Sequence, residues 1–262
     1  MMSKTNVHQS FSVIVIGYDG YKDVWSYFEH FYLKANLNDY FKTIFVSSEE
    51  RGPNSFDCIL AHSNSASKRI EKALEETDAD YIILLLEDYL IEDDSIYYKL
   101  LPFMQFVETN KIDYFCLCNF ITKLRGKKIS NHNDVALLPK TRNYRISLQP
   151  SIWSRKLLSA IVRNDISTLW DFENYLNHNK AYDDIPAFFP AKTKIKIVNM
   201  VDKGEITKKA NKMFQKEGLP KPKRKQISLS KSNIIKIKNF LISLIPGRIL
   251  NRYLNRKLKN KK

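Results

Sequence analysis

The sequence has few cysteines and glycines, no long hydrophobic run, and no acidic residue in its last 42 positions. Three cysteines are too few for a secreted disulfide framework, and no second Cys/His pair near Cys116 and Cys118 completes a metal-ligand pattern. Seven glycines exclude a fibrous repeat. No stretch approaches the ~20 apolar residues that span a bilayer, and no signal peptide is visible. We therefore expect a cytoplasmic protein.

Charge divides the chain into unequal parts. The net charge is +15, and 14 cations without any Asp or Glu lie in residues 221–262, whereas the rest of the chain has 29 cations against 28 anions. This distribution predicts a nearly neutral domain at residues 1–217, a basic linker with prolines at 218–230, and a basic tail at 231–262.

Short strands and helices alternate through the first 120 residues. Buried, β-branched runs predict strands, and apolar residues at helical spacing between them predict helices. Alternation of this kind predicts an α/β fold with a mainly parallel central sheet flanked by helices, and ligands bind beyond the carboxyl ends of such strands. The predicted strands are 11–16, 43–46, 58–61, 81–86 and 113–118.

Two consecutive carboxylates, Glu87 and Asp88, end the most hydrophobic predicted strand, Tyr81–Leu86. Oxygen ligands at the ligand edge of a sheet suit Mg²⁺ or Mn²⁺ bridging phosphates. Capping of the following helix is the alternative for Asp88. The residue types leave both interpretations open.

The order of the motifs resembles that of GT-A glycosyltransferases. A first strand ends at Tyr18-Asp19, a later strand ends at Glu87-Asp88-Tyr89, and the segment 147–153 is followed by 170–173, Trp-Asp-Phe-Glu. The chain is similar in particular to small bacterial enzymes of capsule, exopolysaccharide and O-antigen synthesis, over roughly residues 11–215. This resemblance implies a GT-A-like catalytic domain that transfers a sugar from a nucleotide-sugar. Tyr89 replaces the second carboxylate of the family's Asp-x-Asp motif, so a divalent cation would depend on Asp88 alone, or basic side chains would replace it.

The candidate general base lies in the second acidic block. The resemblance implies that Glu173 or Asp171 takes the proton from the acceptor hydroxyl, with inversion at the sugar carbon, and that Gln149, Trp153 and Trp170 flank the acceptor. A carboxylate that aromatic neighbours partly desolvate has a raised pKa, which suits a general base. The alternatives are that Asp171 caps the helix, that Glu173 complements its dipole, and that Trp153 packs in the core.

Four further residues are candidate donor contacts. The resemblance places nucleotide contacts at Tyr18 and Asp19, where a tyrosine can stack on a base and a carboxylate can accept its N–H. Arg69 and Lys203 could reach a diphosphate. The alternatives are an ordinary Asp-Gly turn for Asp19 and a solvated surface charge for Arg69.

The tail has two short basic amphipathic segments, at 233–245 and after Pro246-Gly247. Such segments are typical of a peripheral anchor on an anionic membrane surface. We therefore expect residues 231–262 to lie on the inner face of the cell membrane, where a polyprenyl-linked glycan would be the acceptor. Packing on the domain and binding of nucleic acid are the alternatives, the latter disfavoured. A non-catalytic basic adaptor is the alternative for the whole protein, and it predicts that the carboxylates scatter over the surface.

Overall fold

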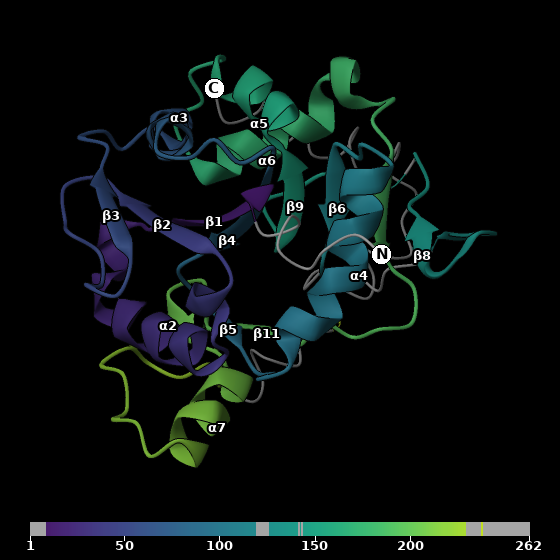
Figure 1. The fold of residues 1–262 in the computed structure, drawn as a ribbon. Helices are drawn as coiled ribbons and strands as arrows, with labels where there is room; N and C mark the ends of the chain where they lie inside the picture. The colour runs from purple at the N-terminus through teal and green to yellow at the C-terminus, as the bar shows by residue number, and fades with distance from the viewer. Residues whose placement is uncertain (1–8, 119–125, 141, 143, 229–236, 238–262) are drawn as a thin grey trace.

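The computed structural model describes residues 9–118, 126–140, 142, 144–228 and 237 (Figure 1). The predicted tail, 231–262, lies outside the described residues apart from Ile237. The helices are α2 (Lys22–Lys34), α3 (Ala66–Glu75), α4 (Ile96–Thr109), α5 (Arg155–Val162), α6 (Leu169–His178) and α7 (Lys208–Lys216), with short 3-10 turns η1 (Asp19–Tyr21), η2 (Leu37–Asp39) and η3 (Lys180–Tyr182).

A nine-stranded sheet forms the centre of the described part of the chain, in the order β3-β2-β1-β4-β9-β6-β10-β8-β7. Its strands are β1 (Phe11–Ile16), β2 (Lys42–Ser47), β3 (Asp57–Leu60), β4 (Tyr81–Leu86), β6 (Tyr114–Cys116), β7 (Lys127–Ile129), β8 (His132–Leu137), β9 (Ser151–Ser154) and β10 (Ala187–Pro190). β3, β2, β1 and β4 are mutually parallel, and only β9 and β8 among these strands run against the others. The predicted α/β fold with a mainly parallel sheet is confirmed.

Alternating side chains of the sheet supply two hydrophobic cores. Val13 and Val15 of β1 belong to the core under α2 and α4, whereas Ile14 and Ile16 belong to the core under α3, α5 and α6. Figure 1 shows these helices on opposite faces of the sheet. Because both faces are covered, β1 is apolar at nearly every position, which explains the continuous run in the sequence.

A third cluster attaches α7 to the outer side of α2. Phe214 of α7 packs against Tyr27 and Phe31 of α2, with ring centroids 4.5 and 6.3 Å apart. Two small ladders lie beside this cluster, one between β5 (Tyr89–Ile91) and β11 (Ile197–Asn199), the other between β12 (Val201–Asp202) and β13 (Glu205–Ile206). They carry the chain from the central sheet back to the end of β4.

Residues 219–228, which we call the strap, follow α7 and lie along the same side of the domain. The Tyr27 hydroxyl donates to the carbonyl of Pro220 (2.8 Å), and the Ile206 N–H donates to the carbonyl of Lys225 (2.8 Å). Ile227 is buried and its N–H returns a bond to Ile206 (3.0 Å). Most of the segment expected as a linker is therefore held against the domain by backbone hydrogen bonds. Within the described residues, no helix is long and apolar enough to cross a membrane.

Candidate functional site

The carboxyl ends of β1 and β4 meet at the turn that follows β1. Ile16 pairs with Leu86, so Gly17 and Glu87 continue side by side beyond the two strands. The Tyr18 N–H donates to Glu87 Oε1 (3.1 Å) and thereby fixes the turn to the acidic segment. Gly17 allows this close approach, since a Cβ there would lie 2.5 Å from the Phe45 ring. The sheet thus brings together the two segments that the sequence analysis singled out.

Glu87 and Arg69 are both buried beneath this turn, each 3% exposed. Burial raises the pKa of Glu87 to about 8, with a further contribution from Asp88. Arg69 of α3 donates to the carbonyl of Gly17 (2.5 Å), and burial lowers its pKa while Glu87 opposes that change. The interpretation of Arg69 as a solvated surface charge is wrong. Its contact with the Gly17 carbonyl assigns it to support of the turn.

Asp88 lies on the side of the small ladders. Its main-chain carbonyl accepts the Met200 N–H (2.7 Å), its carboxylate is bonded by the Val201 N–H, and burial raises its pKa to about 7, with Asp202 adding to the increase. Oδ1 is buried and has no hydrogen-bond partner among the described residues. Asp88 therefore offers one oxygen to a ligand.

A divalent cation at Asp88 would find few protein ligands. Within the described ranges, no three His, Cys, Asp or Glu side chains are grouped as metal ligands. Tyr89, which directly follows Asp88, is buried and donates its hydroxyl to the carbonyl of Leu148 (3.3 Å). These residues do not fit a metal held by the protein alone, and a cation at Asp88 remains a prediction that depends on donor phosphates for its other ligands.

Leu148 connects the two acidic blocks. Its carbonyl accepts the Tyr89 hydroxyl, and its N–H donates to Glu173 Oε1 (3.1 Å). Burial raises the pKa of the Tyr89 phenol, and the nearby carboxylates of Asp88, Glu173 and Glu87 raise it further. Leu148 therefore links Glu173 to the segment Glu87-Asp88-Tyr89, which lies more than 80 positions earlier in the sequence.

Glu173 and Asp171 have different surroundings although they share helix α6. Burial raises the pKa of Glu173 to about 7, and the hydrogen bond from Leu148 opposes this increase. Asp171 is exposed, accepts the Thr168 hydroxyl (2.7 Å) and returns its own N–H to it (3.0 Å), which closes a capping arrangement at the helix start. Asp171 therefore has a capping role, whereas Glu173 has the raised pKa that the sequence analysis expected of a general base.

Of the three residues expected at the acceptor, Trp153 and Gln149 are buried and Trp170 is exposed. Trp153 is 0% exposed, and its indole N–H donates to Ser151 Oγ (2.8 Å), so its ring is part of the core and presents no surface to an acceptor. Gln149 is buried one residue after Leu148. Trp170 is 68% exposed, one turn before Glu173 on α6, and is the one of the three whose ring faces solvent.

Asp19 and Lys203 each take part in a local turn. The Asp19 carboxylate accepts the N–H groups of Ser48 (3.0 Å), Glu49 (2.8 Å) and Glu50 (3.2 Å), so it organises the loop after β2. Lys203 and Gly204 both have positive φ, 51° and 79°, as a type I′ turn between β12 and β13 requires. Lys203 is exposed at the tip of this tight hairpin rather than in a long loop.

Tyr18, Tyr21 and Arg224 form the rim of the site. Tyr18 is half-exposed, and its ring meets the edge of Tyr21 at 5.6 Å between centroids. The Arg224 guanidinium, from the strap, lies 4.2 Å from the centroid of the Tyr21 ring. The sequence analysis missed Tyr21 and Arg224, because no local pattern links the cation-rich strap to the turn after β1.

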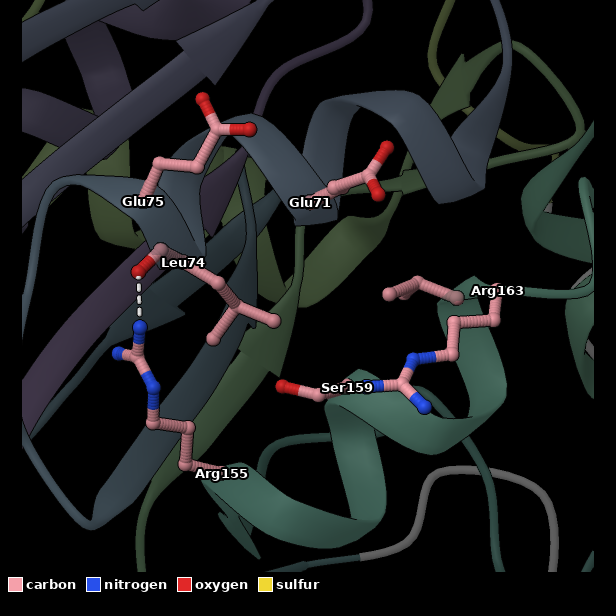
Figure 2. A pocket seen from close by; sticks show the side chains of 7 residues that line it. Glu71, Leu74, Glu75, Arg155, Ser159 and Arg163 are labelled. Atoms are coloured by element: carbon pink, nitrogen blue, oxygen red, sulfur yellow. Dashed lines mark hydrogen bonds between the residues drawn. The ribbon is translucent and has the colours of Figure 1, made fainter.

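A hollow of ≈ 240 Å³ lies between α3 and α5 (Figure 2). It lies on the side of the amino end of β4, away from the carboxyl ends of the parallel strands. Arg155, in its wall, donates to the carbonyl of Leu74 (2.6 Å), and its backbone N–H bonds Asp80 directly before β4. Glu71 and Glu75 pair with lysines of their own helix. Arg155, Glu71 and Glu75 thus have structural partners, and we assign the hollow no chemistry.

Of the comparisons with known proteins, only the one with solved structures gives matches. No protein-family model matches the chain, and no curated protein matches it in sequence. Among solved structures, a cytidylyltransferase from Leptospira borgpetersenii serovar Hardjo-bovis is similar with 10% identity and a TM-score of 0.44, over 80% of this chain and 96% of that one. A mycobacterial protein is similar with 9% identity and a TM-score of 0.43, over 84% and 80%. Likenesses this distant carry no argument about activity.

Proposed function

We propose that the protein is a glycosyltransferase that moves a sugar from a nucleotide-sugar onto an acceptor hydroxyl, with Glu173 as the general base. The observation that supports this proposal most strongly is that Leu148 joins the two acidic blocks beyond the carboxyl end of β4: its carbonyl accepts the hydroxyl of Tyr89, which directly follows Glu87 and Asp88, and its N–H donates to Glu173. That edge of an open α/β sheet is where ligands bind. The donor would lie over the turn after β1, beside Tyr18.

Glu173 has the properties that proton abstraction needs. Its pKa of about 7 lets the ionised form exist at neutral pH while keeping it basic enough to accept a proton from a hydroxyl. The Leu148 N–H orients the carboxylate. The acceptor oxygen then forms a bond to the anomeric carbon, the bond from that carbon to the diphosphate breaks, and the nucleoside diphosphate leaves with the electron pair.

Two variants on one helix test the assignment. Glu173→Gln keeps the size of the side chain and removes the base, so we expect sugar transfer to fall by about 10²–10⁴-fold. Asp171→Asn, two residues away and exposed, should retain most of the activity. Transfer from a panel of UDP-, GDP-, CDP- and dTDP-sugars to a polyprenyl-diphosphate-linked sugar is measured for both variants. Equal rates for wild type and Glu173→Gln would refute the role of Glu173.

The acceptor proposal rests on the basic tail. A polyprenyl-linked oligosaccharide at the inner face of the membrane, within the synthesis of a bacterial surface polysaccharide, would bring the acceptor to a protein whose residues 231–262 bind anionic lipid. Flotation with vesicles containing anionic phospholipid, for the full chain and for a chain ending at residue 230, measures this directly. Unchanged binding after truncation would contradict the anchor.

A non-catalytic adaptor is the competing proposal. It predicts that Glu87, Asp88, Asp171 and Glu173 lie scattered on the surface, but only Asp171 of the four is exposed. Glu87 and Asp88 are buried, and burial also raises the pKa of Glu173. Removing carboxyl groups from water costs free energy, and such a cost is typical of sites that carry chemistry. The arrangement therefore favours the enzyme over the adaptor.

A further inference from the structure

The strap brings a cation to the rim of the site from a distant part of the chain. Arg224 Nε and Nη2 donate to both carboxylate oxygens of Asp23 (2.8 and 2.7 Å), and Nη2 also donates to the carbonyl of Gly20 (2.7 Å). Its guanidinium stacks over Tyr21. These contacts fix the planar group directly beside the turn that follows β1.

One edge of this guanidinium is still available. Nη1 makes no hydrogen bond to the part of the chain that the structure describes, whereas Nε and Nη2 are both bonded. A guanidinium whose Nε and Nη2 are fixed and whose Nη1 has no bond to the described residues is suited to a phosphate oxygen, because its donors match the geometry of phosphate.

Arg224 also acts on the acidic segment at the end of β4. The pKa of Arg224 is raised by its bond to Asp23 and, further away, by Glu87. Burial raises the pKa of the Tyr21 phenol, Asp88 and Glu87 raise it further, and Arg224 opposes them. Tyr21 thus contacts the strap cation and interacts electrostatically with the two carboxyl groups, beside the turn over which the proposed donor would lie.

We propose that Arg224 binds the diphosphate of the donor through Nη1, with Asp23 and Tyr21 holding its guanidinium in position. This inference rests on the proposed function. It makes the strap a part of the donor site, and it places a positive charge near the acidic segment Glu87-Asp88.

Three variants separate binding from a structural role. Arg224→Gln removes the cation, Asp23→Asn removes its anchoring charge but leaves the cation, and Lys223→Gln is a matched charge change one residue away, on an exposed side chain. Binding of inorganic pyrophosphate to the full chain is measured by titration calorimetry at low salt. We expect Arg224→Gln to weaken binding at least about tenfold, the effect of losing one charge-assisted hydrogen bond.

Asp23→Asn keeps the cation but weakens the contacts that position it, so it should weaken binding by less than Arg224→Gln does, and Lys223→Gln should stay within about twofold, as for an exposed charge. If Arg224→Gln and Asp23→Asn weaken binding equally, Arg224 only fixes the strap and the proposal is wrong. It is also wrong if wild type does not bind pyrophosphate or if Arg224→Gln binds it unchanged.

A second measurement separates this proposal from the proposed function. Binding of UDP, CDP, GDP and dTDP is compared with binding of the four nucleosides. Loss of affinity in Arg224→Gln for the diphosphate but not for its nucleoside supports the inference. Pyrophosphate binding that depends on Arg224, without binding of any nucleoside diphosphate and without sugar transfer, would leave the anion site intact and refute the glycosyltransferase. Sugar transfer with equal donor KM in wild type and Arg224→Gln would refute the inference about Arg224 and leave the glycosyltransferase proposal intact.

Discussion

Replacing Glu173 by Gln should make the protein more stable at pH 8 and leave its stability at pH 4.5 nearly unchanged. The folded state raises the pKa of Glu173 from 4.5 to about 7, chiefly because the carboxyl group is buried. Between these two values the folded protein keeps a proton that the unfolded chain releases. The contribution of Glu173 to the unfolding free energy is therefore fully present below pH 4.5 and is lost as the pH rises to 7.

The magnitude follows from the size of that displacement. One pKa unit corresponds to about 1.4 kcal/mol, so a rise from 4.5 to about 7 amounts to roughly 3 kcal/mol of unfolding free energy. Gln has nearly the same volume, and its Oε1 can still accept the Leu148 N–H. The variant should avoid the loss, because it has no proton to release.

Urea denaturation at pH 4.5, 6 and 8 measures the difference. The wild type and Glu173→Gln should unfold at similar urea concentrations at pH 4.5, and their midpoints should separate by roughly 1 M at pH 8. Glu71→Gln, an exposed residue of α3 paired with Lys68, serves as the control and should follow the wild type at all three values. A constant separation between wild type and Glu173→Gln would refute the reasoning, since it would mean that the carboxyl group titrates alike in both states.

Three further predictions concern the turn and the helices around the site. Glu87→Gln should also gain stability over wild type as the pH rises from 4.5 towards 8, because burial raises the pKa of Glu87 to about 8; denaturation at the same pH values measures it. Gly17→Ala should lower the unfolding free energy by about 1–3 kcal/mol, since its Cβ would lie 2.5 Å from the Phe45 ring, and thermal unfolding at pH 7 checks this. Thr207→Ala removes the cap that accepts the Ala210 N–H (3.3 Å) and should cost about 0.5–2 kcal/mol, with Thr207→Ser close to wild type.

Much of the sheet could be predicted because its central strands are buried on both faces. The runs at 11–16 and 81–86 have an apolar side chain at almost every position, and this pattern depends little on what lies elsewhere in the chain. β9 and β10 could not be predicted in the same way. Each has four residues, and β9 becomes a strand only because it pairs with both β4 and β6, which the local sequence does not reveal.

Predictions for single site residues were limited because the local sequence does not show which of these side chains are buried. An arginine on a predicted helix is expected to be solvated, yet Arg69 lies beneath the turn after β1 because that turn leaves the Gly17 carbonyl to be bonded. Trp153 is likewise in the core, in a short strand that the sequence did not identify. Arg224 and Asp23 are 201 positions apart, and no spacing rule connects residues at such a distance.

The raised pKa values resolve an apparent conflict in the site. A diphosphate would be repelled by three ionised carboxylates, but burial raises the pKa values of Glu87, Asp88 and Glu173 to about 8, 7 and 7, so near neutral pH these groups are partly protonated. Together with the cations Arg69 and Arg224, they leave the end of the sheet far less negative than its residue types indicate. A bound diphosphate would favour the protonated forms of Glu87 and Asp88 still further, whereas Glu173, farther along the sheet beside Leu148, must lose its proton to act as a base. The site can therefore bind an anion and abstract a proton at the same pH, because its carboxyl groups have different surroundings although they are chemically alike.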